Sequence, residues 1–194
     1  MEKTHEHHPG HRDRPLIDDA YYKELVESYR DWGDEIHDPS VRERSRILLE
    51  REARFLDQGR YGDWLALYAA ECLYWVPGTP AGDPRREVAI AFDDRRRIED
   101  RIYRLKTGSA WSQSPASRTI RLVSNVEVFQ ARGKEGLMVR SNFMLSEFRA
   151  GEMHVWSGWC GYRLALRSGS YEINVKQVNL IDCDQNLRNP SLVF

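Results

Sequence analysis

The apolar residues of this chain change their spacing once, from a helical period to a strand period, at about residue 110. Before that point they recur three and four positions apart in several segments, and after it they alternate with polar residues through four long segments that are separated by turns. Helices followed by a strand meander are typical of an α+β domain. We therefore expect N-terminal helices packed on a curved, mainly antiparallel sheet.

Capping and breaking signals divide the first part of the chain into four predicted helices, one strand and one loop. The expected helical ranges are 17–32, 41–58, 61–68 and 95–107. Ser40 and Glu43 have the spacing of a capping box, which makes Ser40 the predicted N-cap of the second helix. Asp93 or Asp94 is placed to cap the fourth helix. The apolar run 72–76 predicts a strand, and the Gly- and Pro-rich stretch 78–86 predicts a surface loop.

Four strands are predicted after the fourth helix. Their expected ranges are 120–128, 137–145, 156–166 and 171–178. In the first of them Ile120, Leu122, Val126 and Val128 alternate with polar residues, so we expect these four side chains to share the core face. A change of phase at Val178 predicts a bulge in the last strand.

Length and composition favour a single soluble domain with a separate N-terminal arm. The 194 residues suit one domain, here residues 16–194, and the polar, His-rich segment 1–15 predicts a flexible arm. The arm's histidines lack a framework of other ligands, so no functional metal site is expected there. They are His5, His7, His8 and His11.

Charge and apolar content exclude several partners. A net charge of -1, with 29 basic and 30 acidic side chains, provides no broad positive field for nucleic acid. No apolar stretch approaches the roughly 20 residues of a membrane span, and no secretory signal is present.

Cys72, Cys160 and Cys183 lie far apart without metal-ligand spacing, so we expect buried free thiols and a cytoplasmic location.

The fourth helix carries more arginine than solubility requires, and this predicts a subunit interface. Ile98, Ile102 and Leu105 form a narrow buried stripe, which leaves arginines on the remaining surface. For any single arginine, a solvated helix face with ordinary ion pairs is the simpler interpretation. Taken together with a nearby Trp, the set favours an interface, because Arg and Trp are enriched at interface centres. The predicted interface residues of this block are Arg95, Arg101, Arg104, Trp111 and Arg118.

Two stretches carry a resemblance to a known family. They are LLEREARFLDQGRYGDWLALYAAECLYWVP and DDRRRIEDRIYRLKTGSAWSQSPASRTIRLVSNVEV. In this order they resemble the β (small) subunit of aromatic-ring-hydroxylating dioxygenases, and the likeness extends over roughly residues 40–194. The sequence around ECLYWVP and DDRRRIEDRIYRL is more similar to the benzoate and related aromatic-acid branch of this family than to the biphenyl or naphthalene branch.

The resemblance implies a cone-shaped cystatin-like or NTF2-like fold and an α3β3 assembly with a larger α subunit and other β subunits. It also implies that the α partner carries a Rieske [2Fe–2S] cluster and a mononuclear iron. Electrons would come from NAD(P)H through a separate reductase, and the product would be a cis-dihydrodiol. On this chain His37 and His154 are lone histidines, so we expect no catalytic, cofactor-binding or metal-binding residues here.

Two alternatives from other classes remain open on the sequence. The same fold family contains stand-alone isomerases and dehydratases, for which an acidic base and hydrogen-bond donors are needed. The candidates are Asp57, Tyr68, Tyr74 and His154. The other alternative is a non-enzymatic binding module.

The apolar end at Phe194 docks either on this chain's own sheet or on a neighbouring subunit, and Phe194 is included among the predicted interface residues.

Overall fold

The computed structural model describes residues 18–80, 82–132 and 135–194. The predicted arm 1–15, with its four histidines, lies outside the described residues. The helical elements are α1 (Asp19–Arg30), α2 (Pro39–Asp57), α3 (Tyr61–Leu65), α4 (Arg95–Lys106) and the short 3-10 turn η1 (Trp111–Gln113). The strands are β1 (Asp34–Glu35), β2 (Tyr68–Val76), β3 (Ala91–Asp94), β4 (Arg118–Gln130), β5 (Leu137–Arg149), β6 (Glu152–Arg167) and β7 (Ser170–Leu180).

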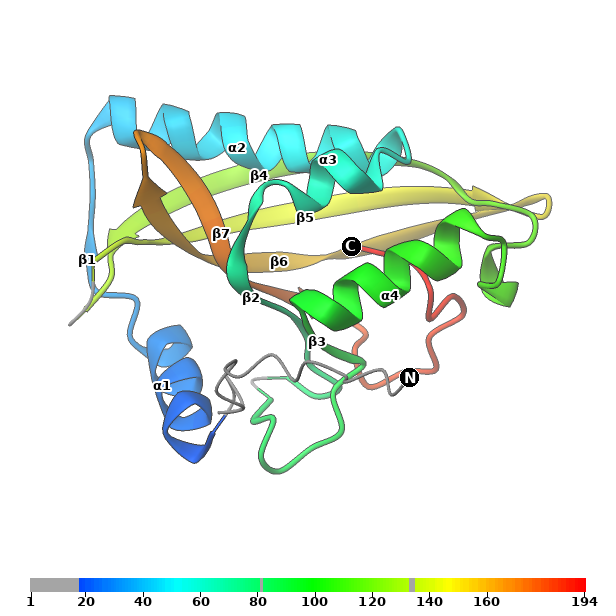
Figure 1. Ribbon diagram of the computed structural model, residues 1–194, viewed down its shortest axis with the longest axis horizontal. Coiled ribbons are helices and arrows are strands. Elements are labelled where there is room, and N and C mark those ends of the chain that lie inside the picture. Colours follow the sequence, from blue (N-terminus) through cyan, green and yellow to red (C-terminus); the bar gives the residue numbers. More distant parts are fainter. Residues whose placement is uncertain (1–17, 81, 133–134) are drawn as a thin grey trace, which may run out of the picture.

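One curved seven-stranded sheet organises the domain, in the order β1-β4-β5-β6-β7-β2-β3 (Figure 1). The four long strands β4 to β7 form an antiparallel meander, as their alternating pattern and the turns between them predict. Only the pairing of β2 with β7 is parallel among the described strands. The predicted α+β class with a mainly antiparallel sheet is confirmed.

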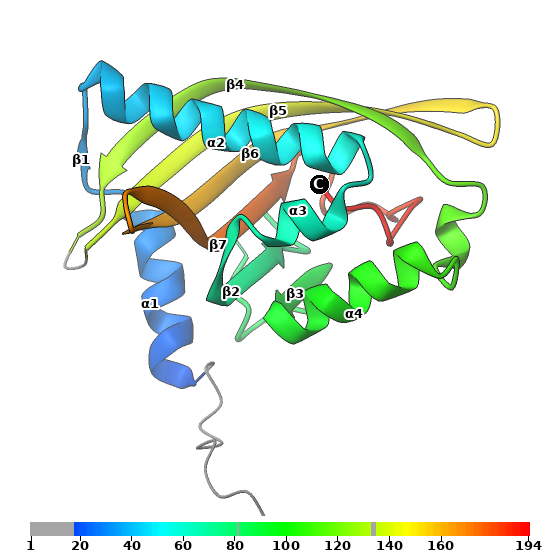
Figure 2. The same cartoon turned by 45° about the horizontal axis from the view of Figure 1, so that its top comes forward.

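The helices divide the sheet into an inner and an outer face. The inner face packs against α2, α3 and α4 through a large apolar cluster that includes Leu49, Trp64 and Ile98. Figure 1 shows α1 on the opposite side of the sheet from α2, and Figure 2 shows α3 and α4 below the C-terminal half of α2. A smaller cluster around Leu25 and Trp75 fixes α1 on the outer face. A sheet covered on both faces explains why β2 reads as a nearly continuous apolar run.

The prediction that Ile120 and Leu122 share the core face with Val126 was wrong. Ile120 and Leu122 are 63% and 62% exposed, whereas Val126 and Val128 are buried. The register of β4 against β5 shifts between Ser124 and Glu127, where β4 has one residue more than its partner. A bulge inverts the alternation because the side-chain period of a strand is two. Ile120 and Leu122 therefore lie on the outer face.

The predicted capping box of the second helix was also wrong. Asp38 is the N-cap of α2, because its carboxylate accepts a hydrogen bond from the main-chain N–H of Ser40 at 2.7 Å. Pro39 then occupies the first helical position, where its fixed φ suits the helix and its missing N–H costs nothing. Asp94 caps α4, as expected, and Asp18 caps α1.

Strand boundaries differ from the predictions at two further places. The sequence 61–68 is helical only through Leu65, and β2 begins at Tyr68 instead of Cys72. The four residues before α4 form the edge strand β3, which the pattern did not predict. The bulge expected in the last strand is present but lies between Ile173 and Val175.

Candidate functional site

A buried carboxylate on the inner face is the centre of the most extensive polar cluster. Glu52 of α2 is 1% exposed, and four donors from four other elements surround it. Its Oε1 accepts hydrogen bonds from Trp64 Nε1 at 3.0 Å, Tyr68 OH at 2.9 Å and Lys176 Nζ at 2.9 Å. Its Oε2 accepts from Tyr162 OH at 2.9 Å. Both carboxylate oxygens are therefore satisfied by side chains of the protein itself.

The last residues of the chain enter the same interior. Lys176 Nζ donates a second hydrogen bond to the main-chain oxygen of Phe194 at 2.7 Å. The Phe194 N–H donates to Tyr74 OH at 3.0 Å, and Arg121 donates to the main-chain oxygen of Val193. Figure 2 shows this segment between the sheet and the helical layer. The chain's own last residues thus fill the interior beside Glu52.

The hydroxyl groups around Glu52 remain protonated donors. Burial raises the pKa of Tyr68 well above its usual value, and the Glu52 carboxylate raises it further. Burial likewise raises the pKa of Tyr162, with smaller contributions from Cys160 and Glu52. Burial also raises the pKa of the Cys160 thiol to about 11. These groups hold the cluster together and do not titrate near neutral pH.

Asp57, the acidic residue predicted for a stand-alone isomerase, connects α2 to β4. Its carboxylate accepts hydrogen bonds at 2.9 Å from Thr119 Oγ1 and from the main-chain N–H of Arg121, whose guanidinium also pairs with it. Tyr74 accepts the Phe194 N–H, as described above. His154 packs edge-on against Trp156 at 4.3 Å between ring centroids. The structure therefore does not bring the four predicted residues together around a common space.

A second buried carboxylate, Glu147 on β5, lies near the end of the meander. It accepts hydrogen bonds from Ser117 Oγ, from Trp156 Nε1 at 3.0 Å and from Asn189 Nδ2 at 2.6 Å. Burial raises the pKa of this carboxyl group, but the three hydrogen bonds together lower it by more, so that the net shift is downward. No pattern in the sequence predicts this cluster, because its members come from three distant segments.

Two of the predicted interface arginines are engaged within the chain. Arg95 Nη1 donates to two main-chain oxygens at the start of β2 at 3.0 and 3.1 Å. Arg101 forms an ion pair with Asp93 at 2.6 Å and also donates to the main-chain oxygen of Pro190. Both side chains therefore join α4 to neighbouring segments of the same domain.

The other predicted interface residues differ in their accessibility. Arg104 is exposed on α4, and Trp111 opens η1 beyond the end of that helix. Arg118 is exposed, with its guanidinium 4.7 Å from the centroid of the Phe148 ring. Phe194 is 3% exposed and packs against this chain's own core. The role of all six residues in an interface stays a prediction.

An apolar surface that the sequence pattern did not predict lies on the outer face of β4, β5 and β6. Neighbouring positions across the three strands are Arg118, Phe148 and Met153, then Ile120, Ser146 and Val155, then Leu122, Met144 and Ser157. We call these nine residues the outer-sheet patch. Five of its apolar side chains are between 47% and 66% exposed, namely Ile120, Leu122, Met144, Met153 and Val155. Contiguous apolar surface of this kind marks an interaction site more often than isolated exposed residues do.

Side chains that could act as metal ligands are not grouped together in the part of the chain that the structure describes. No group of three or more His, Cys, Asp and Glu residues among residues 18–80, 82–132 and 135–194 is arranged to hold a metal ion. Cys72, Cys160 and Cys183 are buried free thiols, as expected. His37 is on the surface, and its Nδ1 lies 3.7 Å from Glu35 Oε1. The other histidine among the described residues, His154, is far from it in the sequence. Among the described residues, no helix is both long and apolar enough to span a membrane.

A family model described as "Ring hydroxylating beta subunit" matches residues 51–185. The benzoate 1,2-dioxygenase subunit beta of Acinetobacter baylyi is 32% identical over 147 residues, which are 73% of this chain and 86% of that protein. The 2-halobenzoate 1,2-dioxygenase small subunit of Burkholderia cepacia is 32% identical over 139 residues, which are 69% of this chain and 84% of that protein. These relatives confirm the predicted benzoate branch.

Solved structures confirm the predicted fold family. The β subunit of the benzoate 1,2-dioxygenase from Burkholderia mallei superimposes with a TM-score of 0.61 at 26% identity, covering 74% of this chain and 93% of that one. A chain of naphthalene 1,2-dioxygenase with indole bound in the active site superimposes with a TM-score of 0.71 at 20% identity, covering 92% of this chain and 96% of that one. The second likeness concerns the fold alone.

Proposed function

The chain belongs to the ring-hydroxylating β-subunit family, and we propose that it is a non-catalytic subunit of a cytoplasmic aromatic-ring-hydroxylating dioxygenase. In this proposal three copies assemble with three α subunits. The α subunits carry the Rieske [2Fe–2S] cluster and the mononuclear iron, and a reductase supplies electrons from NAD(P)H. The complex adds O2 across an aromatic bond to give a cis-dihydrodiol, and the branch favours an aromatic acid as substrate.

The interior supports a structural role for this chain. A general base needs a carboxylate oxygen that faces a substrate, but both oxygens of Glu52 accept hydrogen bonds from buried side chains. The space beside it holds Phe194, whose ring lies 5.4 Å from the ring of Trp156 and 6.5 Å from that of Phe143. The residues that the structure describes also do not fit the ligand sets of a Rieske cluster or a mononuclear iron.

The outer-sheet patch is the observation that carries the assembly role. Leu122 and Met144 are direct cross-strand partners, and Ile120 and Val155 flank the same Ser146. The bulge in β4 turns Ile120 and Leu122 away from the core, so these large apolar side chains are exposed although the same strand buries Val126. A subunit interface accounts for this exposure because association removes such surface from water.

Co-expression with the α subunit of the same dioxygenase tests the proposal. The wild-type chain is expected to elute with the α subunit near the mass of a hexamer. Leu122→Asp should reduce the recovery of the complex about tenfold, which corresponds to about 1.4 kcal/mol. Its melting temperature as an isolated chain should stay near that of the wild type, since Leu122 is exposed.

Leu166→Asp is the matched control, because Leu166 is a similarly exposed leucine on β6 outside the patch. It should assemble like the wild type. Assembly of Leu122→Asp at the wild-type level would show that the patch is not the interface. Elution of the wild-type chain alone would overturn the subunit role, and iron bound stoichiometrically to the purified chain would overturn its non-catalytic character.

A further inference from the structure

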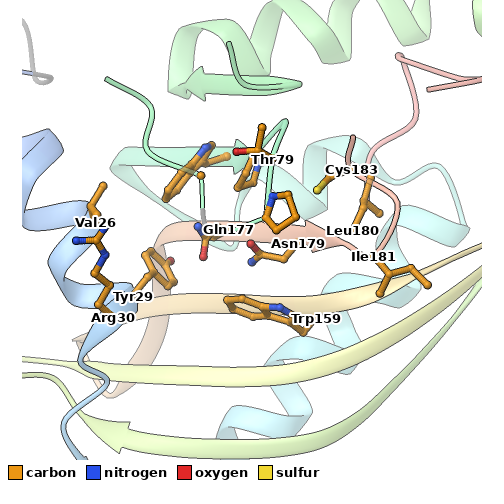
Figure 3. Close-up of a pocket in the computed structure, with 14 residues that line it drawn as sticks. Val26, Tyr29, Arg30, Thr79, Trp159, Gln177, Asn179, Leu180, Ile181 and Cys183 are labelled. Carbon is orange, nitrogen blue, oxygen red and sulfur yellow. The ribbon is translucent and has the colours of Figure 1, made fainter. Parts of the chain in front are cut away.

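A cavity of about 460 Å³ lies on the outer face of the sheet, and one of its lining residues, Trp159, is two residues from Ser157 of the outer-sheet patch on β6. Figure 3 shows Val26, Tyr29 and Arg30 of α1 at one side of it and Ile181 and Cys183 at the other. The strands β2, β6 and β7 form its base. A volume of this size is within the range of small-molecule sites.

Aromatic and aliphatic groups make up most of the lining. Trp75 lies on β2, Trp159 on β6 and Tyr29 on α1, and two prolines of the β2–β3 loop add further apolar surface. The Trp159 ring is fixed from outside the cavity by Trp32, at 5.9 Å between centroids, and by the Arg140 guanidinium at 5.1 Å. A rigid aromatic lining of this kind suits a flat, largely apolar ligand.

The charges around the cavity are few. Arg30, in the last turn of α1, is the only charged side chain among the lining residues of this cavity. It is exposed, and no carboxylate among the lining residues pairs with it. The lining residues therefore offer no counter-charge for a cation.

Three buried polar atoms on lining residues have no hydrogen-bond partner among the described residues. They are Trp75 Nε1, Gln177 Oε1 and Asn179 Nδ2. Trp75 is 1% and Gln177 3% exposed. Leaving such groups unpaired is unfavourable, and native structures contain few of them. Their concentration around one cavity distinguishes this place from the remainder of the described core.

The register of the sheet brings these groups onto one face. Trp75 on β2 is the direct partner of Gln177 on β7. Asn179 is two residues further along β7, and its partner on β6 is Trp159. Residues two apart on a strand point to the same side, so all four side chains are on the outer face. Figure 3 shows Gln177 and Asn179 on β7 between α1 and the segment that carries Ile181 and Cys183.

We infer that this cavity binds a small planar aromatic molecule that carries a hydroxyl group, such as a phenol. A hydroxyl donates one hydrogen bond and accepts up to two. The unpaired set consists of one acceptor, Gln177 Oε1, and two donors, Trp75 Nε1–H and Asn179 Nδ2–H. A carboxylate provides no donor for the Gln177 oxygen, and a hydrocarbon satisfies none of the three atoms. The inference does not depend on the proposed function.

Titration of the full-length, 15N-labelled chain with phenol, toluene and benzoate tests the inference. The indole N–H signals report binding, with Trp75 assigned from Trp75→Phe and Trp159 from Trp159→Phe. Phenol should shift both signals and should bind about tenfold more tightly than toluene, because only phenol pairs the buried polar atoms. Benzoate should bind more weakly than phenol.

Two substitutions that keep the size of the side chain but remove its amide group test the polar contacts of the site separately from the shape of the cavity. Gln177→Met should weaken phenol binding about tenfold, leave toluene binding unchanged and raise the melting temperature of the free chain, since it removes an unpaired buried amide. Asn179→Leu should have the same pattern. Gln58→Met, at an exposed position beyond α2, should change none of these quantities.

Specific results would overturn the inference. If saturating phenol shifts neither Trp75 nor Trp159, the cavity is not a site for this class of ligand. If toluene binds as tightly as phenol, or if Gln177→Met leaves phenol binding unchanged in a chain that remains folded by its NMR dispersion, the hydroxyl is not the recognised group.

Discussion

Lys176 Nζ lies 2.9 Å from Glu52 Oε1 inside the domain, where the two side chains are 3% and 2% exposed. The pair connects the middle of α2 to β7 across 124 residues of sequence. Desolvation of two charges is costly, and here the cost is offset by hydrogen bonds to the remaining lone pairs and protons. The pair fixes the position of α2 on the sheet.

Loss of the lysine should destabilise the domain strongly. Lys176→Met leaves the Glu52 carboxylate buried without its counter-charge, for which a loss of about 3–5 kcal/mol is expected. Urea unfolding followed by tryptophan fluorescence measures the change. Lys23→Met, which removes the exposed pair with Glu27, is the control and should give no resolvable change. Equal stability of Lys176→Met and the wild type would show that the pair is dispensable.

Truncation of the final aromatic side chain should also be costly. Phe194 packs against Trp156 and Phe143 in the interior, so Phe194→Ala creates a cavity. A Phe→Ala change in a core typically costs about 3–5 kcal/mol. Chemical denaturation of the isolated chain is the measurement, and Leu166→Ala at an exposed position is the control. A loss below about 1 kcal/mol would indicate that Phe194 belongs to an interface with another subunit instead of to this core.

Glu147 should contribute to stability at neutral pH but not in acid. Its folded pKa is lowered by hydrogen bonds from Ser117, Trp156 and Asn189, although burial acts in the opposite direction. Because the folded pKa is below the unfolded one, the stabilisation is present above about pH 4.3 and is lost as the pH falls through the folded pKa.

The variant Glu147→Gln keeps the shape of this side chain and removes its titration. The free energy of unfolding of this variant, measured by urea denaturation from about pH 3 to 7, should depend less steeply on pH below about pH 4.3 than that of the wild type. Gln58→Met, at an exposed position beyond α2 that carries no titratable group, is the control and should retain the wild-type slope. If the free energies of unfolding of Glu147→Gln and the wild type depend equally on pH below about pH 4.3, the role of Glu147 is contradicted.

Arg101 and Arg104 should respond differently to charge reversal. Arg101→Glu places a second carboxylate beside Asp93 in a partly buried pair, so it should lower the free energy of unfolding by about 2–3 kcal/mol. Arg104 is exposed, and Arg104→Glu should leave the melting temperature of the isolated chain unchanged. If α4 belongs to the interface, Arg104→Glu should also weaken co-elution with the α subunit. Full assembly of Arg104→Glu would exclude Arg104 from the interface.

Local signals in the sequence determined most of the elements. The alternation in residues 118–180 and the turns at Ala150–Gly151 and Ser168–Gly169 correspond to β4 to β7, because a half-buried strand and a tight turn each have a short-range pattern. Asp18 and Asp94 cap their helices for the same reason. The family resemblance, carried by residues near β2 and α4, was equally local and agrees with the relatives.

The tertiary structure decided which faces and which distant groups meet. The alternation of apolar and polar residues in a strand shows that the side chains point to two faces, but it does not show which face is the core. One extra residue near Asn125 placed Ile120 and Leu122 on the outer face. The parallel pairing of β2 with β7 aligned Trp75 with Gln177, and the packing of α2 brought Glu52 to Lys176. These contacts join residues about 100 or more positions apart, so they depend on how the whole sheet folds and have no signature in any single segment.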